Sequence, residues 1–318
     1  YPDYAPGKLR FAPAATSMIR SGPIWARLTI QTAQGTMKAT LIYNQNARST
    51  DDHNVEILQD ALHGAGYDPV YTPTEKEEDL DAVLAEAGGG LVVVAGGDGT
   101  VRAVARRLLG SDSPMAILPM GTANNIARNF NIDGDPLDLV AALADPFRCP
   151  FDVGKVETPW GTDYFLEALG FGFYADTLAA YGNNEEKSLL RAVGAFTRTL
   201  PNYQARTFTM RLDGEDAGGD YLLVEVLNTT AFGPRLKVAP RADSGDGLFE
   251  IIRIRADARD GFLSYMTSLV AEELHELPSV ETSTARRVEL FWTNFPVHVD
   301  GTLYPPATGE PVPLASNP

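Results

Sequence analysis

The stretch Leu91-Val92-Val93-Val94-Ala95-Gly96-Gly97-Asp98-Gly99-Thr100 decides the fold class. Its first half is a continuous, largely β-branched apolar run, which is typical of a strand covered on both faces. A helical repeat follows, in which Val101, Val104, Ala105 and Leu108 share one face. Three glycines in four positions are costly for packing, but they let backbone amides approach a phosphate at a helix N-terminus. The stretch therefore predicts a strand, a phosphate loop and a helix that Thr100 caps.

The same strand and helix alternation surrounds this stretch. We expect short strands at 41–43 and 115–118, and helices that start near 52 and 77 and cover 123–130 and 135–144. Repeated strand–helix units favour an α/β fold with a doubly wound parallel sheet, which we assign to residues 37–150.

The pattern changes after Cys149. Strand-like segments dominate at 151–156, 163–169, 205–213, 220–228 and 247–255. Helices are expected only near 175–200 and 260–277. Residues 151–318 are thus predicted to form a β-rich, sandwich-like second domain, although the strands at 288–291 and 297–299 could return to the first. Residues 1–36 show no period and are interpreted as a leader or tag-like disordered segment.

The composition excludes several classes of function. The chain has 318 residues with a formal net charge of −16, which disfavours binding to nucleic acid. A single cysteine excludes an internal disulfide, and the four histidines show no metal-ligand spacing. No uncharged apolar run reaches the ~18 residues of a membrane span. The chain is predicted to act in the cytoplasm, without a transmembrane segment.

A second glycine-containing loop follows the next strand. Pro119-Met120-Gly121-Thr122-Ala123-Asn124-Asn125 also leads into a helix. In a parallel sheet both loops lie at the carboxyl edge, where ligands bind in open α/β folds. Neither a P-loop nor a Gly-x-Gly-x-x-Gly motif is present, and an ordinary strand–helix turn remains the alternative for each loop.

Several blocks occur in an order that resembles the catalytic superfamily of diacylglycerol and sphingosine kinases, most closely its small bacterial lipid kinases. They are Asn44 after the first strand, Thr74-Glu75-Lys76, Gly96-Gly97-Asp98-Gly99-Thr100, the segment 119–124, Asp243-Ser244-Gly245-Asp246-Gly247-Leu248 and Val299-Asp300-Gly301. Each block alone is weak, but their shared order covers the chain from Met37 to its end.

The resemblance implies Mg²⁺-dependent transfer of the ATP γ-phosphoryl group to a lipid hydroxyl, on a diacylglycerol-like or sphingoid acceptor at a membrane surface, in a cleft between the domains. ATP would be bound by Asn44, Thr74, Gly96, Gly97, Asp98, Gly99, Thr100, Thr122 and Asn124. Asp98 would organise phosphates and metal, and Asp300 would orient or deprotonate the hydroxyl. Asp243, Asp246 and the carbonyl of Leu248 would hold Mg²⁺, with Asp152 in the surrounding polar network. A homodimer is also implied.

Three departures from the family keep other functions open. Thr302 replaces the glutamate of Asp-Gly-Glu, and Thr302 is no base at neutral pH. Asn125 stands where close relatives carry aspartate, and a bulkier loop occupies 228–234. The alternatives are a soluble-acceptor kinase similar to NAD kinase, and a nucleotide- or lipid-binding regulator with impaired catalysis.

One predicted helix could contact a membrane. Residues 185–200 place Leu189, Val193, Phe196 and Leu200 on one stripe, with Lys187, Arg191 and Arg198 on another face. A basic amphipathic helix of this kind can enter a leaflet. The alternative is a helix that covers the β-rich domain.

Overall fold

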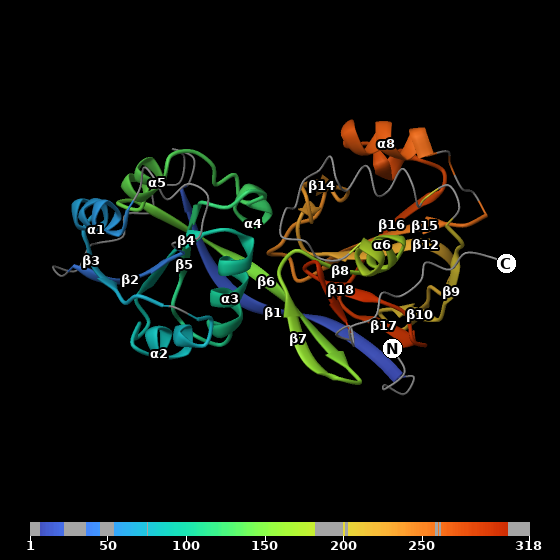
Figure 1. Cartoon of the computed structure of the whole chain (residues 1–318), viewed down its shortest axis with the longest axis horizontal. Helices are drawn as coiled ribbons and strands as arrows, with labels where there is room; N and C mark the ends of the chain where they lie inside the picture. Colours follow the sequence, from blue (N-terminus) through green and yellow to red (C-terminus); the bar gives the residue numbers. More distant parts are fainter. Residues whose placement is uncertain are drawn as a thin grey trace. The chain divides into compact units, whose positions relative to one another are not determined.

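The computed structural model describes residues 7–21, 36–44, 54–74, 76–181, 200, 203–257, 260 and 262–304. The chain divides into two compact units (Figure 1), Ala15–Phe151 and a unit that combines Tyr1–Ala14 with Asp152–Pro318. We name them the α/β unit and the β-rich unit and describe each by itself.

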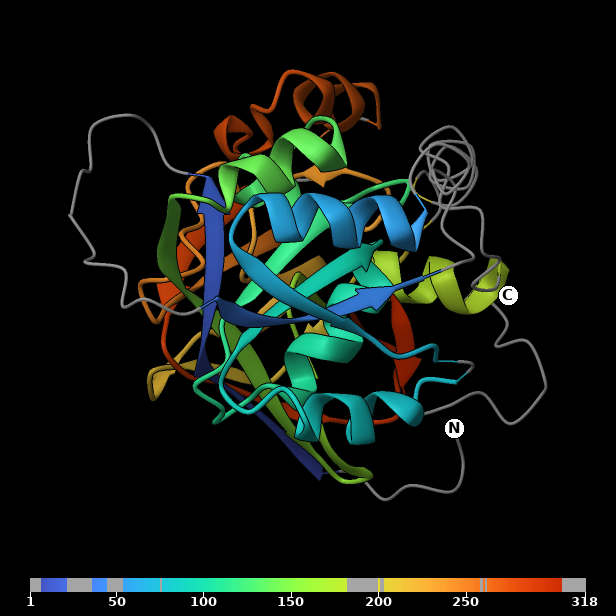
Figure 2. The same cartoon turned by 90° about the vertical axis from the view of Figure 1, so that its left-hand side faces the viewer.

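The α/β unit is built on a parallel sheet with the strand order β3-β2-β4-β5. Its strands are β2 (Met37–Tyr43), β3 (Tyr67–Tyr71), β4 (Leu91–Gly96) and β5 (Met115–Pro119). Its helices are α1 (Val55–Gly64), α2 (Asp79–Ala85), α3 (Asp98–Arg107), α4 (Asn125–Asn129) and α5 (Pro136–Ala142). Figure 2 shows α1 and α5 on one face of the sheet and α2 and α3 on the other. The predicted doubly wound sheet is confirmed.

Local chemistry explains where these elements begin. Residues Leu91 to Ala95 of β4 are all 0% exposed, as the continuous apolar run predicts for a central strand. Asn54 caps α1 by accepting the Ile57 N–H at 2.9 Å, and Asp135 caps α5 ahead of Pro136. Helices α1 and α2 start at residues 55 and 79, a few residues later than the sequence pattern suggested.

Strand β3 is absent from our sequence interpretation. It contains Pro69, which cannot donate to a ladder and argues against a central strand. The structure places β3 at the end of the strand order, paired with β2 alone. An edge strand tolerates proline, so the objection from the sequence does not apply there.

The β-rich unit contains a seven-stranded sheet with the order β16-β15-β12-β8-β18-β19, with β9 also paired to β12. These strands are β8 (Ala168–Gly172), β9 (Arg206–Phe208), β12 (Gly219–Leu227), β15 (Phe249–Arg255), β16 (Val280–Ala285), β18 (Val297–Val299) and β19 (Thr302–Tyr304). A hairpin pairs β13 (Ala231–Phe232) with β14 (Leu236–Lys237).

A second layer of strands in this unit has the order β11-β10-β17-β1, to which β1 contributes its residues up to Ala14. Its strands are β1 (Gly7–Ser21), β10 (Met210–Leu212), β11 (Glu215–Asp216) and β17 (Val288–Trp292). The chain enters the β-rich unit along β6 (Pro146–Thr158), which forms a hairpin with β7 (Gly161–Phe165). Both late strands that the sequence left open, β17 and β18, therefore belong to the β-rich unit.

The two sheets of the β-rich unit enclose one apolar core. Phe171 from β8 and Val226 from β12 join Phe11 from β1 and Trp292 from β17 in a single buried cluster. A second cluster covers the opposite face of the seven-stranded sheet, where α6 (Phe173–Tyr181), α8 (Phe262–Val270) and the short 3₁₀ helix η2 (Leu274–Glu276) pack. The sandwich prediction is confirmed, and the helices create a separate apolar layer.

The interpretation of residues 1–36 as a disordered leader is wrong for residues 7–21. These residues form β1, which pairs antiparallel with β17 from Gly7↔Trp292 to Phe11↔Val288. Leu9 and Phe11 are 0% exposed. Their alternation is short and runs into Pro13, so the strand becomes recognisable only with its partner almost 280 residues later.

Two predicted helices are altered. The helix expected at 175–200 begins as α6, and its basic amphipathic part at 185–200 lies outside the described residues apart from Leu200, which is buried. The helix expected at 260–277 is interrupted at Glu272, whose φ of +62° is incompatible with a continuous helix. Among the described residues, no helix combines the length and apolar character needed to cross a bilayer.

Candidate functional site

The predicted nucleotide residues gather at the carboxyl edge of the α/β sheet. Asn44 directly follows β2, Thr74 follows β3, and the two glycine loops follow β4 and β5. Since β3 lies on one side of β2 while β4 and β5 lie on the other, the order in which the strands are added to the sheet reverses between β2 and β4. Such a switch point is where open α/β sheets bind ligands.

Hydrogen bonds connect Asn44 to the first glycine loop. The Asn44 backbone N–H donates to the Ala95 carbonyl at 3.0 Å, and its side-chain amide donates to the Thr100 hydroxyl at 3.0 Å. Helix α3 is capped by Gly97, without a side-chain cap bond. The prediction that Thr100 caps this helix is therefore wrong, because its hydroxyl bonds sideways to the neighbouring strand end.

The glycines of the two loops lie against each other. A Cβ on Gly121 would lie 2.5 Å from the Gly97 Cα, and one on Gly96 would lie 2.8 Å from the Thr100 side chain. Packing thus requires some of these glycines, contrary to the argument from sequence. Gly99 differs, since a Cβ there would meet no atom of the described residues within 4 Å. Packing therefore does not explain this glycine, and the space beside it favours a ligand.

The second loop is closed by Asn124. Its side-chain oxygen accepts the Gly121 N–H and its amide donates to the Gly121 carbonyl, both at 2.9 Å, while its backbone is left-handed with φ 52°. The Asp98 carboxylate joins the two loops by accepting the Ile126 N–H at 3.2 Å. Both loops are consequently preformed, with Asp98 in the first turn of α3.

Three further positions of interest lie in the α/β unit. Thr74 is half-buried and Thr122 is exposed. Asn125, where the resemblance implied an aspartate, is 3% exposed at the start of α4. A carboxylate buried at that position would carry a large desolvation cost, so an amide is the better fit to this environment.

The predicted metal turn forms a compact acidic loop in the β-rich unit. Asp243 accepts the Gly245 N–H at 3.0 Å, and Asp246 accepts the Leu248 N–H at 2.8 Å. Buried Asp152 accepts the Gly247 N–H at 2.7 Å. Burial raises the pKa of Asp152, and the nearby carboxylates of Asp246 and Asp243 raise it further. The loop therefore has a negative potential that a cation would relieve.

No group of three or more His, Cys, Asp or Glu side chains in the described part of the chain is arranged to hold a metal ion. The predicted Mg²⁺ ligands include only two such side chains, the carboxylates of Asp243 and Asp246, together with the Leu248 carbonyl. Hard oxygen donors of this kind suit Mg²⁺. The assignment remains a prediction that the acidity of the loop supports.

Asp300 occupies a turn between β18 and β19 with a left-handed φ of 48°. Its carboxylate accepts the N–H groups of Leu166, Glu167 and Ala168 at 2.9, 2.9 and 3.0 Å. Thr302 lies opposite Val299 in the β18–β19 ladder. Asp300 thus fixes the connection between β7 and β8, whatever further role its remaining lone pairs have.

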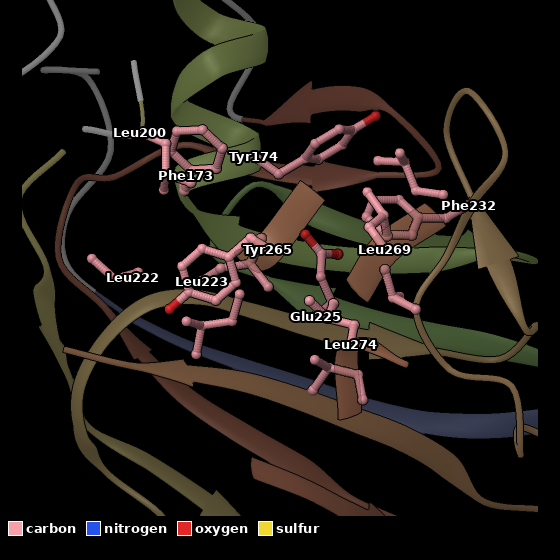
Figure 3. A pocket seen from close by; sticks show the side chains of 14 residues that line it. Phe173, Tyr174, Leu200, Leu222, Leu223, Glu225, Phe232, Tyr265, Leu269 and Leu274 are labelled. Atoms are coloured by element: carbon pink, nitrogen blue, oxygen red, sulfur yellow. The ribbon is translucent and has the colours of Figure 1, made fainter. Parts of the chain in front are cut away.

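An apolar pocket lies within the β-rich unit, on the helix-covered face of its seven-stranded sheet (Figure 3). Apolar and aromatic side chains line it, among them Phe173, Phe232, Tyr265, Leu269 and Leu274. The sequence analysis identified none of these as binding residues, because each also fits an ordinary core position.

Among the described residues that line this pocket, Glu225 is the charged one, and it was not predicted from the sequence. It pairs with His298 at 2.8 Å, and both residues are 0% exposed. A glutamate within the strand Leu222-Leu223-Val224-Glu225-Val226-Leu227 interrupts an apolar run, and that interruption was the available signal.

Comparisons with known proteins agree with this architecture. Residues 38–156 match the model of the diacylglycerol kinase catalytic domain, and residues 174–315 match the YegS C-terminal NAD kinase beta sandwich-like domain. A diacylglycerol kinase of Mycobacterium tuberculosis is 29% identical over 79% of this chain and 85% of its own. A probable YegS-like lipid kinase of Alcanivorax borkumensis is 27% identical over 69% of this chain and 74% of its own.

Solved structures share the fold. One from Bacillus anthracis strain Sterne superposes with a TM-score of 0.67 at 22% identity, over 84% of this chain and 90% of that chain. A diacylglycerol kinase from the same strain gives 0.58 at 18% identity, over 83% and 89% of the two chains. The chain therefore combines a diacylglycerol kinase catalytic domain with a YegS C-terminal domain, and it is similar to proteins named diacylglycerol kinase and YegS-like lipid kinase.

Proposed function

We propose that this protein transfers the γ-phosphoryl group of ATP to a hydroxyl of a membrane lipid, in a Mg²⁺-dependent reaction. The observation that carries the proposal is the apolar pocket of the β-rich unit, in a chain similar to lipid kinases. A pocket with this apolar and aromatic lining suits the hydrocarbon part of an amphiphile. A soluble sugar or nucleoside acceptor, as in an NAD kinase-like enzyme, would leave such a lining unused.

The glycine loops supply the nucleotide side of the proposal. Phosphoryl transfer depends on positioning and charge neutralisation more than on covalent chemistry. Backbone N–H groups at the start of α3 are oriented for phosphate oxygens, and the absence of a side chain at Gly99 leaves room for close approach. Asn44 and Asn124 hold the two loops in this conformation before ATP binds.

Asp98 and the acidic loop are the proposed groups for binding metal ions. Asp98 stands in the first turn of α3, where it would organise the metal that accompanies the phosphates. Asp243, Asp246 and the Leu248 carbonyl would hold Mg²⁺, whose positive charge would offset the negative charge of these oxygen ligands. Asp152 would keep this loop in place through its bond to the Gly247 N–H.

Asp300 is the proposed group for the acceptor hydroxyl. Because three backbone N–H groups fix its carboxylate, it is held rigidly and can orient a hydroxyl by accepting its hydrogen bond. Thr302 offers no second carboxylate, so Asp300 would act alone. This departure also favours a second candidate function, a nucleotide- and lipid-binding regulator that transfers phosphate slowly or not at all.

Transfer of ³²P from γ-labelled ATP to a panel of lipids in vesicles tests the proposal. We expect label in organic-extractable lipid, lost in Asp98→Ala and Asp300→Ala. Asp112→Ala removes an exposed carboxylate beyond α3 and serves as the matched control with unchanged transfer. Label on a water-soluble acceptor would favour the NAD kinase-like alternative. ATP binding without transfer to any acceptor would favour the regulator.

A further inference from the structure

The apolar pocket contains one carboxylate whose hydrogen bonds are incomplete. Glu225 is 0% exposed, and its Oε1 has no hydrogen-bond partner among the residues that the structure describes. Figure 3 shows its carboxylate pointing between side chains that come from α6, α8 and β13. A buried polar atom without a partner is expensive, so its presence in an apolar layer calls for a physical explanation.

The sheet is built to bring this carboxylate into the pocket. Val224 and Val226, on either side of Glu225 in β12, point into the sandwich core. Glu225 therefore points to the helix-covered face. Its neighbour across the β12–β8 ladder is Gly170, and a Cβ on Gly170 would lie 2.0 Å from the Glu225 Oε2. A glycine at this place is what lets the carboxylate pass across β8.

His298 holds the carboxylate in one orientation. It is the neighbour of Gly170 on β18, and its Nε2 lies 2.8 Å from the Glu225 Oε2. Its Nδ1 accepts the Gly301 N–H at 3.4 Å, which leaves the ring proton on Nε2 for donation to Glu225. The ring stacks on Phe232 at 5.7 Å and meets the Tyr174 ring edge-on at 4.8 Å. Oε2 is thus satisfied and fixed, while Oε1 is left for another donor.

A purely structural role is a poor explanation for this pair. Replacing a buried ion pair by apolar side chains of similar volume is often neutral or stabilising, so packing alone does not require a glutamate. Burial raises the pKa of Glu225, against the opposing effect of His298. A donor on a bound molecule would remove the same penalty by completing the hydrogen bonds of Oε1.

We propose that Glu225 determines acceptor specificity, by selecting an amphiphile that carries a hydrogen-bond donor, a hydroxyl or an amino group, within the part that enters the apolar pocket. The inference rests on the proposed function, since it takes the pocket to be the acceptor's binding site. An acceptor with plain hydrocarbon chains would leave Oε1 unpaired and bind less tightly. Sites built to hydrogen-bond a substrate group reject analogues that lack it more strongly than apolar pockets reject an extra methylene.

Matched lipids test this selection. Dioleoylglycerol is compared with diricinoleoylglycerol, which adds one hydroxyl to each chain, and with a C18 amino diol, all in phosphatidylcholine vesicles. Binding is measured without ATP, by displacement of a fluorescent long-chain probe, and ³²P transfer is measured separately. We expect at least one donor-bearing lipid to bind about tenfold more tightly than dioleoylglycerol.

Three variants identify the residue responsible. Glu225→Leu should reduce the preference in binding to less than about twofold, because the donor-bearing lipid would bind less tightly and dioleoylglycerol more tightly. Glu225→Gln keeps the shape, with its oxygen accepting from His298 and its NH2 group at the place of Oε1. A hydroxyl can accept from this NH2 group but an ammonium group cannot, so the variant should retain selection for the hydroxyl lipid and lose selection for the amine, even if the leucine variant folds poorly. Leu269→Ala changes another residue that lines the same pocket, and it should lower the affinity for all three lipids by similar factors.

The outcomes separate this inference from the kinase proposal. Equal binding of all three lipids by the wild type, or an unchanged preference in Glu225→Leu, would overturn the selection by Glu225 while label transfer still establishes a lipid kinase. A donor preference in binding, with no label on any lipid, would support the selection and contradict the kinase function.

Discussion

The two glycine loops of the α/β unit (the α/β side) and the apolar pocket of the β-rich unit (the β-rich side) are built in different ways. On the α/β side, two loops that follow neighbouring strands are closed by backbone contact between Gly97 and Gly121. On the β-rich side, the pocket carboxylate depends on Gly170, Glu225 and His298, which come from three different strands. The first side is local and made mostly of backbone. The second is assembled from side chains that are distant in the sequence, which leaves more freedom to change specificity without disturbing phosphate binding.

The contact between the glycine loops gives the largest expected effect. Gly121→Ala would place a Cβ 2.5 Å from the Gly97 Cα and 2.7 Å from the Asn124 side chain, so the loops must separate. Displacement of about 1 Å can lower catalysis about 100-fold, and we expect a loss of that size in label transfer. Gly64→Ala, where a Cβ meets nothing within 4 Å, is the control and should retain activity. Normal transfer in Gly121→Ala would contradict the close contact.

The corresponding test on the β-rich side is Gly170→Ala. The added methyl group collides with the Glu225 carboxylate, and we expect the free energy of unfolding to fall by about 1–3 kcal/mol in urea titrations. In a Glu225→Ala background the same change should be much less harmful, with a coupling above about 1 kcal/mol. Additive effects of the two substitutions would show that Glu225 does not pass over Gly170.

Gly99→Ala distinguishes a glycine kept for a ligand from one kept for packing. Since a Cβ at this position meets no atom within 4 Å, the variant should be as stable as the wild type or more stable by up to about 1 kcal/mol. ATP affinity, measured by calorimetry, should nevertheless fall about tenfold if phosphate occupies that space. Unchanged ATP affinity would mean that the nucleotide does not approach Gly99.

The acidic loop gives the smallest effect, and its sign follows from Asp152. Because the folded state raises the pKa of this carboxyl, the native protein binds its proton more tightly than the unfolded chain does. The protein thus loses stability as the pH rises from the ordinary pKa of an aspartate through the raised pKa of Asp152. Asp152→Asn should remove this loss and be more stable at pH 8 than the wild type by less than about 1 kcal/mol. MgCl₂ should reduce the difference in stability between the wild type and Asp152→Asn at pH 8. Asp243→Ala should abolish this effect of MgCl₂. A wild type that gains stability relative to Asp152→Asn as the pH rises would contradict the sign.

The α/β side could be predicted because its signals are local. The strand, loop and helix at 91–108 follow one another, and the two asparagines that hold the loops lie within or next to recognisable blocks. What the sequence could not show was why each glycine is there. Gly97 and Gly99 look alike in the sequence, and only the position of Gly121 separates packing from open space.

The β-rich side could be predicted only as a class of fold. Glu225 and His298 become partners through the register of β12, β8 and β18, which no local pattern encodes. Strand β1 was missed for the same reason, because Leu9 and Phe11 gain their burial from pairing with β17. Strand β3 was missed because its edge position, which permits Pro69, depends on the order of the whole sheet.

The most direct test of the division between the two sides is the initial rate of ³²P transfer to vesicle lipid, measured across ATP and lipid concentrations. We predict label in lipid with the wild type, a raised KM for ATP alone in Gly99→Ala, and a raised KM for lipid alone in Leu269→Ala. No label in any lipid, or two variants that shift the same KM, would contradict the account.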